Sequence, residues 1–404
     1  MSNTFHAGVV AEIAGGSDPQ CATCRRAPIN SSRRIPALDG LRGIAILLVL
    51  LWHSVFYARF ESHPLLNGLL GIGRLTWSGV DLFFVLSGFL IGGILLDNRE
   101  SPNFFKTFYL RRAYRILPLY FVVVAFCFIT FEAGHHGLTP RSLANWLDGP
   151  IPWWSYVTFT QNLWMAKVGG FSRAGLNVTW SLAIEEQFYL TLPLLVRWVA
   201  PRKLIFVVVG VVLGAPILRA LLIHHLAHGG FDAYVLMPCR ADGLGLGVLC
   251  AILVRKERTW NYFLAHRSWI RTMVVVLGLG VVAITFKGYA LFSGALYGLE
   301  YSVLALFYTS VVLVAVTDED KFVKAVLCNR ALTKLGIVAY GTYLLHYLFI
   351  DLVQFLVNFL NAGFSPFHIR GASVMGVVVA VMVASISWRF FEKPLVHRAH
   401  AYKY

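Results

Sequence analysis

Charged residues are scarce in this chain of 404 residues: Asp, Glu, Lys and Arg make up only 14%, whereas hydrophobic residues make up 57%. Soluble domains carry about 25% charged residues, so this shortage excludes an ordinary soluble protein. Apolar runs of about 20 residues, long enough to cross a bilayer, recur along the chain. They predict an all-α integral membrane protein, a bundle of about ten transmembrane helices. The expected spans are 41–58, 80–97, 114–131, 179–198, 203–222, 238–254, 270–287, 296–316, 335–359 and 371–390.

Cysteine is also scarce, with six residues in the whole chain. The pair Cys21-x-x-Cys24 stands without a second pair of ligands, so it does not predict zinc, and no metal site is expected elsewhere. The other four cysteines fall in or beside expected spans, where a small apolar packing role is usual. Residues 1–34 lack the apolar core of a signal peptide. They are polar and aperiodic, which predicts a disordered basic cytoplasmic tail before one membrane domain, residues 35–400.

The net charge of +15 has two competing explanations. Most Lys and Arg residues fall in alternate connections between the expected spans, which is the positive-inside pattern. It predicts a multi-pass protein of the cytoplasmic (inner) membrane, with both termini and the loops near 105, 260 and 325 in the cytoplasm. No basic stripe is interleaved with exposed aromatic residues, so the charge does not indicate a nucleic-acid partner.

The stretch LDGLRGIAILLVLLWHS, residues 38–54, carries two polar groups inside an apolar run, Arg42 and His53. Eleven residue steps along an α-helix turn through about 1100°, so both side chains are expected on one face, roughly 16 Å apart along the axis. A polar stripe is costly against lipid and should face a protein interior or a wet cavity.

Further ionisable groups are expected at three depths of the membrane. At the cytoplasmic end, Arg42 is joined by Arg111, Arg112 and Arg115 of FYLRRAYRILPLY. Clustered guanidinium groups suit phosphates, although contact of each arginine with membrane lipid headgroups is an equally good explanation from position alone. The middle layer holds His53, Ser87 and His346. His53 is favoured as functional, whereas Ser87 next to Gly88 suits close helix packing.

The outer layer is expected to hold five charged residues: Asp81, Glu185, Glu186, Arg240 and Asp242. Asp81, Arg240 and Asp242 also fit ordinary interfacial charges. Adjacent carboxylates within a span need a cavity or partners, so one of the two glutamates is expected to pair with an arginine. The three layers together suggest a polar channel.

Seven motifs, in order, resemble the membrane acyltransferase-3 family. They are RRIPALDGLRGIAILLVLLWHS, GVDLFFVLSGFLIGGILL, FYLRRAYRILPLY, TWSLAIEEQFYLTLPLL, CRADGLGLG, AYGTYLLHYLFI and FFEKP. The resemblance extends over residues 35–395. The family's Arg-x10-His element is matched by Arg42 and His53, and its Arg-x-x-Arg element by Arg112 and Arg115. No C-terminal SGNH-type domain, as found in many polysaccharide-modifying members, is recognised after FFEKP, so direct transfer or handover to another protein is expected.

The resemblance implies an O-acyltransferase that takes an acyl group, acetyl foremost, from cytoplasmic acyl-CoA. The implied acceptor is a hydroxyl of a glycan, a lipid-linked sugar or a macrolide-like metabolite. We assign the sequence candidates to three roles: catalysis by His53 as general base with Arg42, Glu185 and Glu186; donor binding by Arg42, Arg111, Arg112 and Arg115; and acceptor binding by Asp81, Ser87, Arg240, Asp242 and His346.

Two other functions compete with this one. A proton-coupled transporter would use His53, Glu185 and Glu186 as a proton relay, but it leaves the arginine cluster unexplained. A non-catalytic membrane partner of an envelope assembly would use the polar residues only to lock helices together. Alanine at His53 would then lower folded yield rather than activity.

Overall fold

A computed structural model describes residues 35–56, 73–139, 141–171, 173–286, 297–360 and 366–404. Every element within these ranges is helical, which confirms the all-α prediction. The predicted tail, residues 1–34, and the Cys21–Cys24 pair lie outside the described residues.

The helices of the first half surround the candidate site. They are α1 (Pro36–Leu51), the π-helix η1 (Trp52–Phe56), the 3-10 helix η2 (Arg74–Ser78), α3 (Gly79–Asp97), α4 (Phe104–His135), the short α5 (Arg141–Trp146), α6 (Trp153–Val157) and α7 (Gln161–Val168), and α8 (Thr179–Trp198).

The helices of the second half complete the bundle. They are α9 (Pro201–His225), α10 (Gly229–Val235), α11 (Met237–Leu253), α12 (Glu257–Ala265), α13 (Arg267–Phe286), α14 (Tyr297–Thr317), α15 (Lys321–Leu327), α16 (Arg330–Ile337), α17 (Ala339–Leu360), α18 (Pro366–Ser387), the π-helix η3 (Trp388–Glu392) and α19 (Lys393–Ala399).

Each of the ten expected spans overlaps a described helix, but fewer than ten of these helices are apolar enough to count as spans. In the described part of the chain eight helices are long and apolar enough to cross a membrane, and a ninth is added if α10 and α11, bent by 40°, form one span. The remaining helix, α8, begins and ends where expected but carries Glu185 and Glu186. The protein is thus a multi-pass helical membrane protein.

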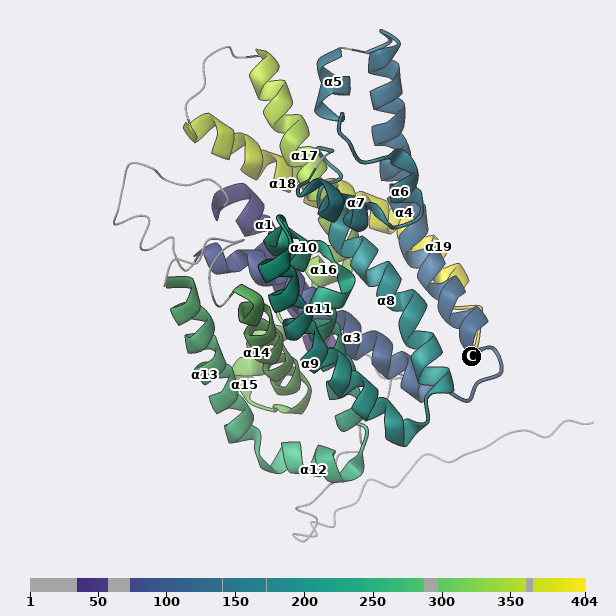
Figure 1. Ribbon diagram of the computed structural model, residues 1–404, viewed down its shortest axis with the longest axis vertical. Helices are drawn as coiled ribbons and strands as arrows, with labels where there is room; N and C mark the ends of the chain where they lie inside the picture. The colour runs from purple at the N-terminus through teal and green to yellow at the C-terminus, as the bar shows by residue number, and fades with distance from the viewer. Residues whose placement is uncertain (1–34, 57–72, 140, 172, 287–296, 361–365) are drawn as a thin grey trace, which may run out of the picture.

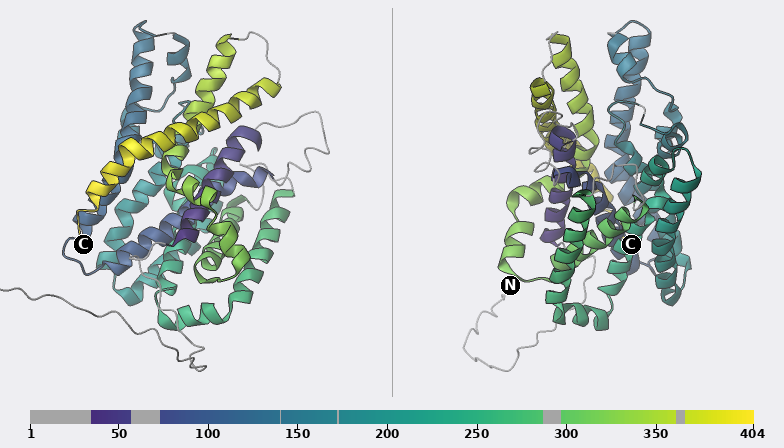
Figure 2. Two further views of the ribbon diagram at one scale, coloured as in Figure 1. Left: turned by 180° about the vertical axis from the view of Figure 1, so that it is seen from behind. Right: turned by 60° about the vertical axis from the view of Figure 1, so that its left-hand side comes forward.

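Different helices form the two ends of the bundle. α5 and the end of α4 lie at the top of Figure 1, whereas α12 lies at the bottom and the C-terminus in the lower half. Figure 2 shows α18, η3 and α19 running as one diagonal rod across the back of the molecule. This rod brings α19 against the first turns of α4. The assignment of the lower end to the cytoplasm stays a prediction.

Close helix contact positions the inner helices. α3 packs most extensively against α11, and a Cβ atom on Gly88 would lie only 2.0 Å from the Leu244 carbonyl oxygen. Gly247 on α11 faces the same restriction, with 2.2 Å to the Val85 carbonyl oxygen. Small residues that let two backbones approach are typical of membrane helix pairs. Gly88, rather than Ser87, therefore supplies the close packing, and the Ser87 side chain is left for another contact.

Candidate active site

A first cavity lies among α1, α3, α4, α8 and α17 and has a volume of about 250 Å³. We call it the arginine cavity. Its polar lining is provided by Arg42, Ser87, Arg112, Arg115, Ser181, Glu185, Tyr189, Tyr340 and Tyr343. The structure therefore brings Arg42 of α1 together with the Arg112–Arg115 pair of α4, as the sequence predicted. Three guanidinium groups around one small cavity favour an anionic ligand.

Helical spacing determines which arginines of α4 reach this cavity. Arg112 and Arg115 are three residues apart and share a face, and Arg112 lies over the Tyr189 ring, 5.9 Å from its centroid. Arg111 is rotated by about 100° from Arg112. It donates to the Tyr402 carbonyl oxygen at 2.6 Å and 3.1 Å and lies over the Tyr404 ring. Arg111 thus contacts the C-terminal segment and does not line the arginine cavity, so the geometry does not support its predicted place in the donor-binding cluster.

Glu185 lies in the arginine cavity and not in a separate outer layer. Ser87 Oγ donates to its Oε1 at 2.8 Å and Tyr189 OH donates to its Oε2 at 3.0 Å. The expected arginine partner is thus replaced by two hydroxyl groups, although Arg42 and Arg112 are close enough to interact with the carboxylate electrostatically. The predicted three-layer separation is wrong at this point.

The length of α4 explains the error. The helix begins at Phe104, ten residues before the expected span, so Arg112 lies about 12 Å along its axis rather than at its end. Glu186 is turned by about 100° from Glu185 and lines neither of the two cavities of the candidate site. Within the described residues, its buried Oε1 atom has no hydrogen-bond partner.

A second cavity, of about 480 Å³, is lined by His53. We call it the aromatic cavity, because its lining includes Trp52, Trp77, Phe171, Trp180, Phe231, Tyr234, Tyr343 and Tyr347. His53 lies in the π-helix η1, so the expectation of a regular α-helix through this residue is wrong. Single π-helical turns are frequent at functional sites. Val80 and Tyr343 line both cavities, which therefore adjoin each other at these two side chains.

The structure brings His53 and His346 together. His346 Nε2 lies 3.3 Å from His53 Nδ1, and His346 is fully buried and lines neither cavity. This geometry does not support the predicted direct contact of His346 with an acceptor.

Backbone carbonyl groups determine the tautomers of both imidazoles. His346 Nδ1 lies 2.6 Å from the Tyr343 carbonyl oxygen, and His53 Nδ1 lies 3.0 Å from that of Val49. A carbonyl oxygen only accepts, so each Nδ1 must carry the proton. The Nε2 lone pair of His346 then accepts from His53 Nδ1–H, and the lone pair of His53 is on Nε2. The contact thus leaves His53 Nε2 basic, which is what a general base requires.

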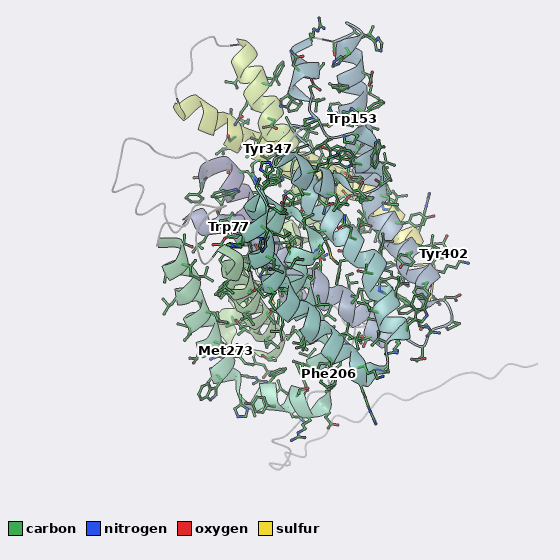
Figure 3. The ribbon with its side chains drawn as sticks, in the orientation of Figure 1. Trp77, Trp153, Phe206, Met273, Tyr347 and Tyr402 are labelled. Carbon is green, nitrogen blue, oxygen red and sulfur yellow. The ribbon has the colours of Figure 1, made fainter. Side chains whose placement is uncertain are left out.

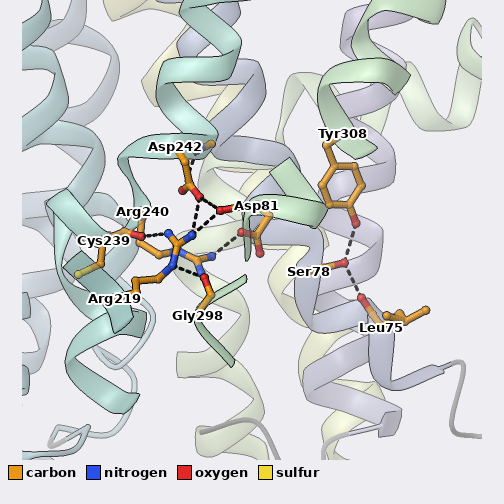
Figure 4. A network of polar contacts seen from close by, with 11 residues as sticks. Leu75, Ser78, Asp81, Arg219, Cys239, Arg240, Asp242, Gly298 and Tyr308 are labelled. Atoms are coloured by element: carbon orange, nitrogen blue, oxygen red, sulfur yellow. Dashed lines mark hydrogen bonds and ion pairs between the residues drawn. The ribbon is translucent and has the colours of Figure 1, made fainter. Parts of the chain in front are cut away.

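Asp81, Arg240 and Asp242, the remaining acceptor candidates, line neither cavity but belong to a buried network shown in Figure 4. Arg240 Nη2 lies 2.5 Å from Asp81 Oδ1, and Arg219 Nη2 lies 2.7 Å from Asp242 Oδ2. Arg219 also donates to the carbonyl oxygens of Gly298 and Cys239. These pairs join α3, α9, α11 and α14, a geometry that favours helix locking over the predicted acceptor binding.

Sequence reasoning missed Arg219, although the signal was present. Arg219 lies within the expected span 203–222 and is fully buried, so the reasoning applied to Arg42 also applied to it. It missed Tyr189 and Tyr343 for a different reason: tyrosine is common at membrane interfaces, and its sequence position does not separate a cavity wall from an interfacial anchor.

No metal centre is evident in the described part of the chain, where no group of three or more His, Cys, Asp or Glu residues is arranged to hold an ion. The arrangement is instead that of a multi-pass membrane protein with a cationic cavity adjoining a cavity that holds a basic imidazole. The chain belongs to the acyltransferase-3 family, described as "Acyltransferase domain", whose model matches residues 35–388.

The curated relatives carry O-acetyltransferase names. O-acetyltransferase OatA of Staphylococcus aureus (strain NCTC 8325 / PS 47) is 27% identical over 388 residues, covering 90% of this chain and 58% of the relative. Peptidoglycan O-acetyltransferase OatA of Listeria monocytogenes serovar 1/2a is 28% identical over 390 residues, covering 90% of this chain and 56% of the relative. The chain thus spans less than three fifths of the length of these relatives. No solved structure matches it significantly.

Proposed function

We propose that this protein is an integral O-acyltransferase of the cytoplasmic membrane that moves an acyl group, acetyl foremost, from cytoplasmic acyl-CoA to a hydroxyl group. The observation that carries the proposal is the adjacency of the two cavities: the arginine cavity suits the anionic end of a donor, and the aromatic cavity holds the free base of His53. The relatives' names support acetyl transfer to a glycan acceptor.

The donor is proposed to bind with its phosphates in the arginine cavity. Three cationic side chains, Arg42, Arg112 and Arg115, face one cavity carboxylate, Glu185, so the cavity has an excess of positive charge. Asp39 lies 4.0 Å from Arg42 and orients its guanidinium. An axial distance of roughly 16 Å from Arg42 to His53 is comparable to an extended pantetheine arm. The thioester would thus reach the boundary formed by Val80 and Tyr343.

The acyl transfer proposed at this boundary needs one base and one leaving thiol. His53 Nε2 accepts the proton of the acceptor hydroxyl while the hydroxyl oxygen attacks the thioester carbonyl carbon. The carbon–sulfur bond breaks, and the departing sulfur takes the proton from His53, which leaves an ester and free coenzyme A thiol. General-base help of this kind contributes about 10²–10⁴ in rate.

His346 is proposed as a positioning residue for this step. When His53 becomes an imidazolium, its Nδ1–H remains directed at the Val49 carbonyl oxygen and at the Nε2 lone pair of His346. Hydrogen bonds from a charged donor are stronger than neutral ones. The arrangement therefore stabilises the protonated base without a carboxylate partner.

The function is tested with purified protein in nanodiscs, acetyl-CoA and an envelope glycan extract. We expect release of free coenzyme A thiol and an acetyl mass increase on a glycan, both of which depend on the protein. Solute uptake by proteoliposomes that needs no coenzyme A would instead favour the transporter. Absence of thiol release with every extract and metabolite fraction of the source cell would refute the acyltransferase proposal.

A further inference from the structure

We infer that the aromatic cavity is the acceptor site and that it selects an uncharged pyranose unit, with Trp77, Tyr347 and Asn177 as its contact residues. The inference rests on the proposed function, because it assigns the acceptor of the same reaction. It differs from the sequence prediction, which gave the acceptor to Asp81, Ser87, Arg240, Asp242 and His346.

The first argument is the composition of the cavity wall. Of its eighteen described lining residues none is Asp, Glu, Lys or Arg, and its polar side chains are His53, Asn177, His228 and the aromatic Trp and Tyr groups. A charged ligand would leave its solvation shell without gaining a counter-ion from this wall, which is costly. Within the described residues, this lining therefore disfavours phosphate- or carboxylate-bearing acceptor units.

The second argument is the shape and chemistry of the wall. The volume of the aromatic cavity, about 480 Å³, falls within the range of about 300–1,000 Å³ typical of small-molecule sites. Aromatic faces carry a negative quadrupole, and a pyranose ring presents C–H groups with a partial positive charge on its flat faces. Stacking against Trp and Tyr therefore suits a sugar ring, while its hydroxyl groups need polar partners at the rim.

The third argument is an unsatisfied polar atom at the same wall. Asn177 lines the cavity, and its Oδ1 atom is buried without a hydrogen-bond partner among the described residues. A buried hydrogen-bond acceptor that is left without a donor is energetically unfavourable. A ligand hydroxyl donating to Asn177 Oδ1 would satisfy it. The segment is held in place, since Gly175 N donates to Asp351 Oδ2 at 3.2 Å.

An ordinary interfacial belt does not explain these aromatic residues. Belt residues face the headgroup region, whereas Trp180 and Tyr343 are only 4% and 7% exposed and still line the cavity. Figure 3 shows Trp77 and Tyr347 in the part of the molecule next to α1 and α17. Tyr347 also meets the His53 ring edge-on, with centroids 5.3 Å apart. A sugar stacked here would therefore present its hydroxyl groups close to the base.

The test measures binding of three probes to the full-length protein in nanodiscs: maltotetraose, chitotetraose and tetragalacturonic acid. We expect wild-type protein to bind the two neutral oligosaccharides and to bind the uronic acid at least 10-fold more weakly. Trp77→Leu and Tyr347→Leu remove an aromatic face, which should raise the Kd for the neutral probes about 5- to 10-fold. Tyr347→Phe keeps the ring and should stay close to wild type.

A matched control is Trp154→Leu, because Trp154 is 56% exposed and lies outside the cavity; its Kd should equal that of wild type. Coenzyme A affinity is measured on every sample, which identifies variants that are misfolded rather than defective in acceptor binding. If Trp77→Leu fails to fold, Tyr347→Leu and Asn177→Ala decide the outcome.

Two results overturn the inference: wild-type protein that binds neither neutral probe, or binding that is unchanged in the leucine and alanine variants. Equal binding of the uronic acid overturns the claim of selectivity for uncharged units. Failure of the proposed function is a different result, namely protein that binds a neutral probe but releases no thiol from acetyl-CoA with any acceptor.

Discussion

Adjacent arginines of α4 provide the sharpest test of the donor site. Arg112 lines the arginine cavity, whereas Arg111 binds the Tyr402 carbonyl oxygen. Arg112→Gln should lose one charge-assisted contact with a donor phosphate, worth about 1.5–3 kcal/mol. The Kd for coenzyme A should therefore rise about 10- to 150-fold. Isothermal titration calorimetry in nanodiscs measures it, with Arg111→Gln as the matched control that should bind like wild type.

Mutual repulsion among the cavity arginines gives this prediction a second readout. Arg42, Arg112 and Arg115 interact unfavourably with one another in the ligand-free protein. Arg112→Gln should relieve part of that repulsion, so the ligand-free Tm should stay equal or rise while coenzyme A binding weakens. A residue that only anchored α4 at the membrane surface would behave differently. Unchanged coenzyme A affinity together with a lowered Tm would refute the reasoning.

Three further predictions concern His346, Glu185 and the Asp81–Arg240 pair. His346→Phe should lower kcat about 10- to 150-fold at an unchanged KM for acyl-CoA, since one hydrogen bond to the protonated His53 is lost. His346→Gln should recover part of the lost kcat. An equal loss of kcat in both variants would argue for a packing role of His346. Glu185→Gln should bind coenzyme A at least as tightly as wild type, because the substitution removes a negative charge from the arginine cavity. Glu186→Gln is the control, since Glu186 does not line that cavity. Weaker coenzyme A binding by Glu185→Gln would contradict this prediction. Asp81→Leu should cost about 3–5 kcal/mol of stability by leaving Arg240 unpaired. The double variant Asp81→Leu/Arg240→Met should recover most of this stability, as measured by thermal unfolding. No recovery in the double variant would show that the two residues are not coupled.

The long helices could be predicted from the sequence because extended apolar runs mark most of them. Each of the ten expected segments overlaps a helix in the described residues, and α8 has the expected bounds, residues 179–198. The depth of the α4 arginines in the membrane was harder to predict, because the beginning of α4 is not apolar. FYLRRAYR continues the helix toward its N-terminus: Arg112 and Arg115 line a protein cavity, and Arg111 contacts the C-terminal segment. A hydropathy pattern contains no information about that cavity.

The site was predicted in part. Arg42, His53, Arg112 and Arg115 were identified from spacing and family motifs, and the structure brings the three arginines into one cavity. The partners of each residue could not be predicted, because they come from other helices: Ser87 and Tyr189 for Glu185, and His346 for His53. The turn at His53 was also unpredictable, because a π-helix differs from an α-helix by one residue per turn and leaves no clear sequence pattern.

The central claim is that the His53 imidazole is the base for acyl transfer, and one paired measurement tests it most directly. Coenzyme A affinity and acyl transfer are measured on the same purified samples of wild type and His53→Gln. Gln is similar in size and polarity but cannot accept a proton at neutral pH, so we predict wild-type coenzyme A affinity and a loss of transfer of about 10²–10⁴. If His53→Gln retains most of the transfer activity, the imidazole is not the base, and the contact between His53 and His346 is structural.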